Sequence, residues 1–346
     1  MPELSWSVFE IWNQSLSVRP EREPEKRDYI WASEIGGAMI DRFLKMNGVA
    51  PSNPPNIRSL RKFAAADIFE WLVGFVLRRA GILIDGQEKL SFQYPDLLRV
   101  SGKLDFLAGG LPDWERAKSD IAQIGLPPML DTASQAIVKH LSGIYGNEPL
   151  KTLVLEIKSL GAFVFDRYEV LKQAAPHHRG QTFHYLKAKD LPEGHIVYIC
   201  RDDCRMLEIG IFNPSDAEAA YRKDIETITA FISQNVSPPK EKEVLFDDLT
   251  FKFRSNWHIE YSQYLTLLYG YKQPMEYRDK WKSFVSSWNR VFNRCVTGKN
   301  MTAKNMLAIT AAKNHFPNWD ELVDRAKSAA AKNPAIIAET ESDETE

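Results

Sequence analysis

A short apolar run that carries two charged residues at its end constrains the fold of this chain more than any other feature. The run spans residues 153–157 and reads Leu-Val-Leu-Glu-Ile, and Lys158 follows it directly. A nearly continuous apolar run of this length is typical of a strand buried on both faces. We therefore expect a sheet with this strand in its interior and helices on both sides.

Apolar runs and turn-forming residues predict how the rest of the chain is organised. We expect an N-terminal arm over residues 1–30, a core over 31–238 with an insertion at 111–149, a helical region over 245–330 and an acidic, disordered tail over 331–346. The step Pro238-Pro239 marks the edge of the core. The expected fold class is α/β, with a mixed sheet of four or five strands flanked by helices and a helical C-terminal region.

Hydrophobic periodicity predicts the individual elements of the core. Helices are expected at 31–46, with Ser33 as the N-cap, and at 57–80, 133–144, 178–187 and 217–234. Strands are expected at 82–84, 90–94, 97–107, 195–200 and 206–212, with a turn at Asp85-Gly86 between the first two. The helix over 57–80 has one apolar side, made of Phe63, Ala66, Ile68, Leu72, Phe75 and Val76.

Charge and cysteine content narrow the class of protein. The net charge is −2, so the overall charge does not indicate which kind of partner the protein binds. A surface that binds nucleic acid would have to be a local basic patch. The cysteines Cys200, Cys204 and Cys295 are too few and too scattered for a disulfide framework, which indicates a reducing setting. The sequence shows neither a signal peptide nor a stretch of about 20 apolar residues that would span a bilayer. We expect a soluble, cytoplasmic protein.

Three charged residues at predicted strand ends are candidates for chemistry. Glu156 and Lys158 are two apart in a strand and share one face of it. Asp105 follows Gly102 at the end of another predicted strand, so Asp105 and Glu156 converge if the two strands are neighbours. Converging carboxylates suit Mg²⁺ or Mn²⁺, which prefer oxygen ligands. A Glu-x-Lys triplet alone is common at solvated strand edges, so it carries weight only in combination.

Four features occur in a fixed order along the chain: Glu70 in a helix, then Gly102-Lys103-Leu104-Asp105, then Glu156-Ile157-Lys158, then a helix with Gln181 and Tyr185 on one face. In this order they resemble the PD-(D/E)xK nuclease superfamily, and within it the branch of RecB-like, CRISPR-associated and phage exonucleases. The resemblance runs from about residue 31 to 212, and weakly on to about 270. It implies a restriction-endonuclease-like core.

The resemblance also implies a role for each matching residue. Asp105, Glu156 and the main-chain carbonyl of Ile157 would bind Mg²⁺ or Mn²⁺, and Glu70 would bind the ion directly or through water. Lys158 would orient or help to deprotonate the attacking water, while Gln181 and Tyr185 would hold the DNA backbone. The chemistry would be metal-assisted, in-line attack on a phosphodiester. The alternatives are a solvated helix position for Glu70 and a purely structural role for Gln181 and Tyr185.

One departure from this branch concerns its iron–sulfur cluster, which many members hold on four cysteines. Ala38 stands where the first cysteine would be, and Ile259, Ser262 and Leu268 stand in later cysteine positions. Cluster binding needs thiolates, so we predict no iron–sulfur cluster and apolar packing of the replacements instead.

The C-terminal region differs in charge from the rest of the chain. Residues 251–315 contain 11 Lys or Arg against 3 Asp or Glu, and aromatic residues are interleaved with them: Trp257, Tyr261, Tyr264, Tyr269, Tyr271, Tyr277, Trp281 and Trp288. Basic charge with aromatic faces is typical of contact with DNA, as a duplex end or a single strand. The alternative is that these aromatics form the core of a helical region. The acidic tail either mimics DNA, docks a basic partner or keeps the chain soluble.

Together these features predict a metal-dependent deoxyribonuclease. The resemblance favours an exonuclease in recombination, repair or phage replication, with a recombination, annealing or helicase protein as a possible partner and no membrane partner. Two alternatives stay open: a catalytically silent DNA-binding or assembly subunit with a nuclease fold, and a structure- or sequence-specific endonuclease.

Overall fold

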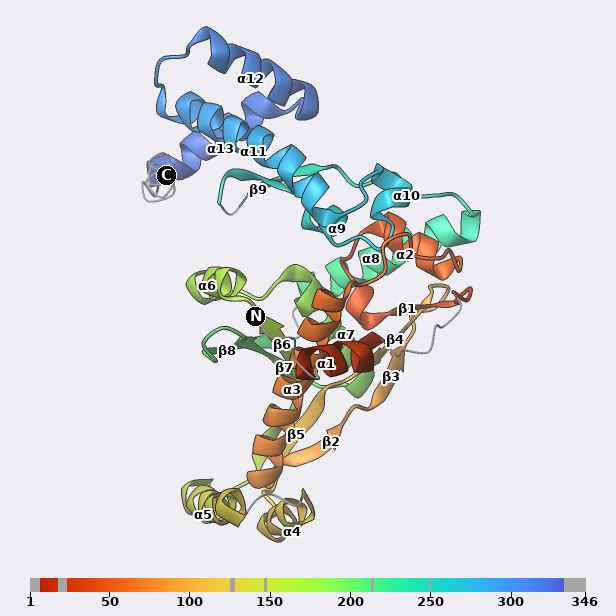
Figure 1. The fold of residues 1–346 in the computed structure, drawn as a ribbon, viewed down its shortest axis with the longest axis vertical. Helices are drawn as coiled ribbons and strands as arrows, with labels where there is room; N and C mark the ends of the chain where they lie inside the picture. Colours follow the sequence, from red (N-terminus) through yellow and green to blue (C-terminus); the bar gives the residue numbers. More distant parts are fainter. Residues whose placement is uncertain are drawn as a thin grey trace. The chain divides into compact units, whose positions relative to one another are not determined.

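The computed structural model describes residues 7–17, 24–124, 128–145, 148–212, 215–248 and 250–332. It divides into two compact units (Figure 1). The first unit comprises Met1–Ala50 and Pro55–Pro238, and the second comprises Pro51–Pro54 and Pro239–Glu346. The predicted tail from residue 333 onward lies outside the described residues.

The first unit is built on a five-stranded sheet, here called the main sheet. Its strands run in the order β2 (Leu83–Gly86), β5 (Phe106–Gly110), β6 (Leu150–Leu160), β7 (Glu193–Cys200) and β8 (Met206–Phe212). Only the β6–β7 pair is parallel, so the main sheet is mixed. Strand β6 is central, and its residues 154–157 are buried. The predicted interior strand and the mixed α/β fold class are confirmed.

Helices cover both faces of the main sheet, and the alternation of side chains along β6 decides which residues they contact. Leu155 and Ile157 face α3 (Ile57–Arg79), which packs through Phe69, Val73 and Leu77. Val154 lies on the opposite face, in the core formed with α7 (Pro176–Lys189) and α8 (Ser215–Gln234). Glu156 and Lys158 share that second face by the same alternation.

A three-stranded sheet, here called the small sheet, adjoins the main sheet. Its order is β1 (Tyr29–Trp31), β4 (Arg99–Lys103), β3 (Lys89–Phe92), with β1 parallel and β3 antiparallel to β4. The single strand predicted over 97–107 is therefore wrong. The chain leaves the small sheet at Lys103 and enters the main sheet at Phe106, because β4 and β5 find different pairing partners.

Two predictions about the N-terminal half are also wrong, the second of them in part. Residues 31–46 do not form one helix: a 3₁₀ turn at Ala32–Glu34 follows β1, and α2 (Met39–Met46) begins only after Gly36, whose φ is +70°. Ser33 is therefore not an N-cap. The apolar side predicted for α3 is buried only in part, since Phe75 packs with Ala117 and Val138 whereas Phe63, Ile68, Leu72 and Val76 are between 43% and 64% exposed. The main sheet instead contacts the adjacent side of the helix.

Several elements were missed or displaced. The N-terminal arm contains α1 (Val8–Ser17), and a helix, α6 (Ala162–Leu171), follows β6 where a loop was expected. The insertion forms two helices, α4 (Trp114–Ile124) and α5 (Pro128–Tyr145), rather than one. Asp85 and Gly86 lie inside β2, and the chain turns after them at Gln87, whose φ is +62°.

The second unit is mainly helical, as predicted. A hairpin of β9 (Val244–Asp247) and β10 (Lys252–Ser255) precedes α9 (Trp257–Glu260), α10 (Leu265–Tyr269), α11 (Pro274–Thr297), α12 (Ala303–His315) and α13 (Trp319–Lys332). Its core is aromatic, with the rings of Phe253 and Trp319 stacked at 5.2 Å. No helix among the described residues has the length and apolar character needed to cross a membrane.

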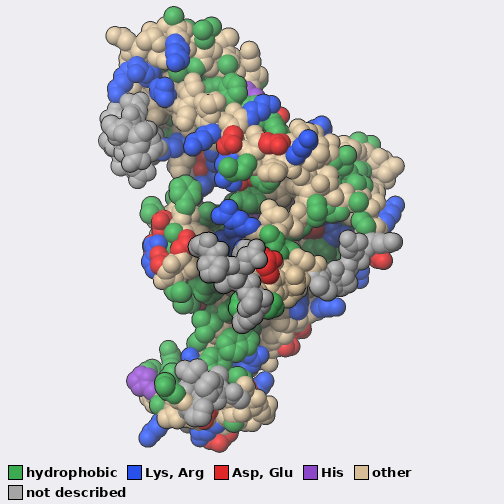
Figure 2. All heavy atoms as spheres, viewed as in Figure 1, with side chains coloured by type: hydrophobic (Ala, Val, Ile, Leu, Met, Phe, Trp, Pro, Cys, Tyr) green, Lys and Arg blue, Asp and Glu red, His purple; other side chains and the backbone are tan. Residues whose placement is uncertain are grey.

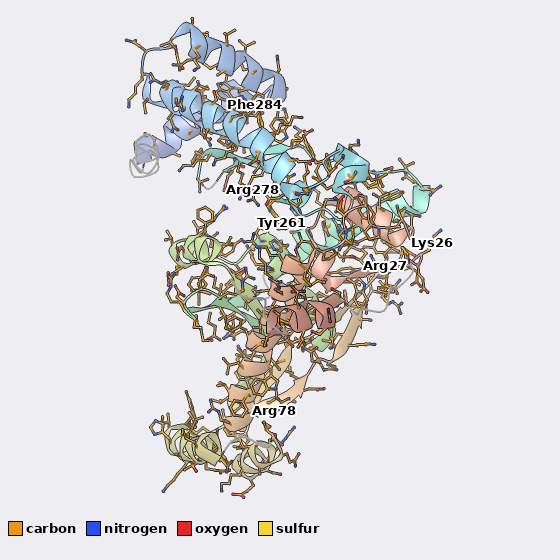
Figure 3. All side chains as sticks on the ribbon, viewed as in Figure 1. Lys26, Arg27, Arg78, Tyr261, Arg278 and Phe284 are labelled. Carbon is orange, nitrogen blue, oxygen red and sulfur yellow. The ribbon has the colours of Figure 1, made fainter. Side chains whose placement is uncertain are left out.

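The aromatic residues singled out in the second unit differ in burial, and Tyr269, Tyr271 and Trp281 are half-buried. Tyr264, Tyr277 and Trp288 are buried, which is the structural alternative to base stacking. Tyr261 is 66% exposed and Trp257 is 37% exposed. Figure 3 labels Tyr261 together with Arg278, which pairs with Glu260, and with Phe284, which is also exposed.

Candidate active site

The C-terminal half of β6 holds the two charged residues of the Glu-x-Lys triplet, inside the strand rather than at its end, because β6 continues to Leu160. Glu156 is only 1% exposed, and the Lys158 ammonium donates a hydrogen bond to its Oε1. Among the residues that the structure describes, no group bonds to the other carboxylate oxygen, Oε2. A buried carboxylate oxygen without a partner is costly, so this position suits a cation.

Asp105 comes from the chain segment between the two sheets and reaches the same place. Phe106 pairs with Leu155 in the antiparallel β5–β6 ladder, so the residue before it, Asp105, lies opposite Glu156. The N–H of Ile157 donates to Asp105 Oδ2 over 2.7 Å. The structure thus brings together Asp105, Glu156 and Lys158 as the sequence predicted.

Glu70 reaches this group from α3, which packs on β6. The charges of Asp105 and Glu156 each interact with that of Glu70. The side-chain amide of Gln87 donates to Glu70 Oε1, and the main-chain N–H of Gln87 donates to the Asp105 carbonyl over 3.1 Å. Gln87 therefore links two of the acids. The sequence analysis missed it, and the only local sign was its place after the Asp85-Gly86 step.

Burial and mutual repulsion make these acids reluctant to ionise. Desolvation, with the charges of Asp105 and Asp67, raises the pKa of Glu70 to about 7. Desolvation also raises the pKa of Glu156 to about 8, against the opposing effect of Lys158, and raises the pKa of Asp105. The site therefore holds acids that protons or cations stabilise.

The pKa of Lys158 is also raised, but for an ammonium group a raised pKa favours the charged form. Burial by itself lowers the pKa of its ammonium group, but the charges of Glu156, Asp105 and Glu70 outweigh burial and leave that pKa raised. With these acids around it, Lys158 stays protonated at neutral pH.

Helix α7 contributes the other predicted pair, Gln181 and Tyr185. Both side chains are buried, and the Gln181 amide donates to the Tyr185 hydroxyl over 3.3 Å. The Tyr185 hydroxyl in turn donates to the carbonyl of Lys103 over 2.9 Å. Burial, with a contribution from Glu156, raises the Tyr185 pKa, so the hydroxyl keeps its proton. This chain of bonds fixes the end of β4, two residues before Asp105.

The closeness of α7 to β4 depends on Gly102. A Cβ atom at Gly102 would lie 2.7 Å from the Cβ of Ala32 and 2.7 Å from Cε1 of Tyr185. The glycine of the Gly-x-x-Asp motif is therefore a packing requirement that lets the tyrosine approach the backbone.

Two residues beside Lys158 extend the site. Lys158 pairs with Tyr198 in the β6–β7 ladder, and the Tyr198 hydroxyl lies 2.9 Å from Nδ1 of His178. Burial, His177 and Lys158 all lower the pKa of His178, so this imidazole is neutral at pH 7. His178 is thus a half-buried residue of α7 that contacts Tyr198 beside the site.

The donor set around the C-terminal half of β6 fits a divalent cation held on oxygen atoms. Mg²⁺ or Mn²⁺ would stabilise the ionised carboxylates of Glu70, Asp105 and Glu156, whose pKa values are all raised. Either ion would also give Glu156 Oε2 the partner that it lacks among the described residues. In their present positions, no three His, Cys, Asp or Glu side chains of the described residues form a ready metal cluster. The Glu156 and Asp105 contacts described above would have to rearrange for a metal to bind.

The positions of the absent cluster cysteines are largely buried. Ala38 is 8% exposed in the first unit. In the second unit Ile259 packs with Leu265 and Tyr277, and the Ser262 hydroxyl accepts from the N–H of Tyr264 over 3.0 Å. The expected absence of an iron–sulfur cluster stays a prediction.

The comparisons with known proteins give distant structural likenesses. No protein-family model matches it, and no curated protein matches its sequence. Among solved structures it is similar to SSO0001, with 13% identity and a TM-score of 0.42, over 76% of this chain and 96% of that one. It is also similar to an alkaline exonuclease from Laribacter hongkongensis, with 10% identity and a TM-score of 0.32, over 65% of this chain and 93% of that one. Likenesses this distant carry no argument, so function has to be argued from the residues of the site.

Proposed function

We propose that this chain is a deoxyribonuclease that depends on Mg²⁺ or Mn²⁺. The proposal rests on the buried carboxylate of Glu156, which lies opposite Asp105. One of its oxygens accepts a hydrogen bond from Lys158, and the other has no partner among the described residues. A carboxylate in this position costs folding energy unless a cation relieves it. A costly acid pair at one point of a stable fold is typical of a site kept for function.

The chain's own residues take distinct parts in this proposal. Asp105, Glu156 and the carbonyl of Ile157 would hold the metal, and Glu70 would hold it directly or through water. When bound, the metal lowers the pKa of water and stabilises negative charge on phosphate oxygens. Gln87 holds the Glu70 side chain in place through its amide.

Lys158 acts best as a cation rather than as a base. Its pKa is raised by three surrounding carboxylates, so it carries a proton that offsets phosphate charge and orients the attacking water. Tyr185 acts as a positioning residue, because its hydroxyl is committed to the Lys103 carbonyl next to Asp105. Contact of Gln181 with the DNA backbone stays a prediction.

The charge of the second unit supports DNA as the substrate. Lys and Arg side chains gather on its surface over α11–α13 (Figure 2), and Lys282, Arg290, Lys299 and Lys304 are all exposed. Basic surfaces of this kind bind phosphates without reading sequence. An exonuclease in recombination, repair or phage replication, located in the cytoplasm, is the form of the activity that we propose.

A catalytically silent DNA-binding subunit is the second candidate. It is favoured by the contacts that already engage the acids, since Asp105 accepts from Ile157 and Glu156 accepts from Lys158. A sequence-specific or structure-specific endonuclease is a third form of the same chemistry.

One experiment separates these candidates. Linear, closed circular and end-blocked DNA are incubated with the protein in Mg²⁺, in Mn²⁺ and in chelator, beside Lys158→Ala and a matched control, Lys151→Ala. Lys151 lies in the same strand but is 58% exposed and pairs with Glu193. We expect loss of linear DNA that chelator and Lys158→Ala abolish and Lys151→Ala does not. Absence of chelator-sensitive cleavage would contradict the enzyme, and cutting of closed circles would contradict a strict exonuclease.

A further inference from the structure

The side chains on the outer face of the small sheet have no role in the site described above. Along β1, β3 and β4, buried residues alternate with exposed ones: Ile30, Leu90 and Val100 point into the core, and their neighbours point away from it. The side chains on this outer face are Tyr29, Trp31, Lys89, Ser91, Arg99, Ser101 and Lys103. It carries aromatic, hydroxyl and basic groups and, within the three strands, no carboxylate.

Two aromatic rings occupy one edge of this face. Tyr29 and Trp31 lie two apart in β1, and their rings meet edge-on at 5.1 Å. Arg99 lies over the Tyr29 ring at 5.5 Å, and Arg27, labelled in Figure 3, lies over it at 5.7 Å. Trp31 is nevertheless 37% exposed. Aromatic side chains on the open face of a sheet, with guanidinium groups beside them, are how proteins stack unpaired bases.

The other edge of the face concentrates positive charge. Lys89 and Lys103 are directly opposite each other in the β3–β4 ladder, and like charges in this position destabilise a sheet. No ion pair of the described residues involves either lysine. A polyanion bound across both lysines would relieve this repulsion.

The lysine edge continues directly into the candidate active site. Only Leu104 separates Lys103 from Asp105, so the lysine lies next to the proposed metal ligands along the chain. Acidic residues near the aromatic edge are already engaged: Glu34 pairs with Arg27 at 3.1 Å, and the exposed Asp28 lies 3.7 Å from Arg99.

We propose that the outer face of the small sheet binds single-stranded DNA and leads it to Asp105. Unpaired bases stack at Tyr29 and Trp31, and the backbone crosses Lys89 and Lys103 toward the metal-binding acids. The face is large enough for about two or three nucleotides, as on other single-strand-binding sheets. Unpaired strands are required because bases in a duplex do not expose their faces for stacking. The delivery of the strand to Asp105 rests on the proposed nuclease function. The binding of single-stranded DNA by this face does not.

The test measures binding without cleavage. Fluorescence anisotropy of a labelled dT12 oligonucleotide is recorded in chelator over a range of NaCl, for the wild type, Trp31→Ala, Trp31→Phe and Lys89→Gln. Matched controls are Phe212→Ala, an exposed aromatic on β8, and Lys118→Gln, an exposed lysine on α4. Circular dichroism melting confirms that each variant is folded.

We expect Trp31→Ala to weaken binding of dT12 by at least about 5-fold, because one lost stacking contact has this effect or more. Trp31→Phe should retain most of the affinity. Lys89→Gln should lower the slope of log affinity against log salt by about 0.7, the value for one phosphate contact on a single strand. The two controls should bind as the wild type does.

Two results would overturn the inference: wild-type protein that binds duplex but not dT12, and folded Trp31→Ala and Lys89→Gln variants that bind dT12 as the wild type does. The outcome is independent of the nuclease proposal. Weakened binding in a protein that never cleaves DNA would contradict the enzyme and retain the binding face, whereas unchanged binding in an active nuclease would do the reverse.

Discussion

Gly102→Ala is the substitution that tests the geometry of the site most directly. The added Cβ would meet Ala32 Cβ and Tyr185 Cε1 at 2.7 Å each, and the Tyr185 hydroxyl oxygen at 2.9 Å. Ordinary carbon contacts are about 3.5 to 4.0 Å, so neighbouring groups must move by roughly an ångström. Ala32 is buried at the start of the 3₁₀ turn, and Tyr185 is 1% exposed. Neither has free space to move into.

The magnitude follows from this lack of space. Adding one methyl group to a tightly packed core costs about 1 to 3 kcal/mol. For a domain of this size, each kcal/mol lowers the melting temperature by about 2 to 4 °C, so we expect a decrease of roughly 2 to 12 °C. The movement of Tyr185 also breaks its bond to the Lys103 carbonyl. Because that bond fixes the backbone beside Asp105, chelator-sensitive cleavage should fall further than stability does.

The assay combines melting by circular dichroism with metal-dependent cleavage of linear DNA at a temperature where the variant is folded. The matched control is Gly143→Ala in α5, where a new Cβ has nothing within 4 Å. There we expect unchanged cleavage and a gain of up to about 1 kcal/mol from helix propensity. If Gly102→Ala melts within a degree of the wild type and cleaves DNA normally, the close approach of Tyr185 does not position Asp105, and the reasoning fails.

Three further predictions concern Glu156, Tyr185 and the basic residues of the second unit. Folding raises the pKa of Glu156 from 4.5 to about 8, so the folded protein binds more protons than the unfolded chain between these values. The contribution of Glu156 to stability in chelator should therefore be greatest below about pH 4.5 and be lost as pH rises through about 8. Urea denaturation of Glu156→Gln should show a flatter dependence of stability on pH. The same pH dependence in the variant and the wild type would contradict the raised pKa. Tyr185→Phe leaves the Lys103 carbonyl without its donor and should cost about 1 to 3 kcal/mol in urea denaturation, and a loss below 0.5 kcal/mol would show that the bond contributes little. Changing Lys282 and Arg290 to Gln should lower the salt slope of DNA binding if the second unit contacts phosphate, and an identical slope would remove that unit from the interface.

The motif residues were predictable from the sequence because each is tied to a local pattern. The apolar run before Lys158 identified the central strand, and the spacing of Glu156 and Lys158 placed both side chains on one face. The sequence predicted that Asp105 and Glu156 would converge if their strands were neighbours, and the β5–β6 register meets that condition. The long helix α3 was also found, since 23 residues of helical spacing leave little ambiguity.

The partners of these residues were not predictable, because they depend on contacts between distant segments. Gln87 reaches Glu70 only because the turn after β2 lies beside α3, and nothing in a glutamine next to a turn indicates this. Likewise, the apolar residues of α3 do not reveal which side the main sheet will cover, since the helix is apolar over much of its circumference.

The run of residues 97–107 shows most clearly where sequence ends and tertiary structure begins. Its alternating pattern by itself determined that the segment is extended and that Asp105 lies near its end. Only the tertiary structure decided that β4 pairs with β1 and β3, whereas β5 pairs with β2 and β6. Strand pairing is a choice among partners far apart in the chain, and it is settled by which faces can be buried together. That choice places Asp105 in the short segment that joins the two sheets, opposite Glu156.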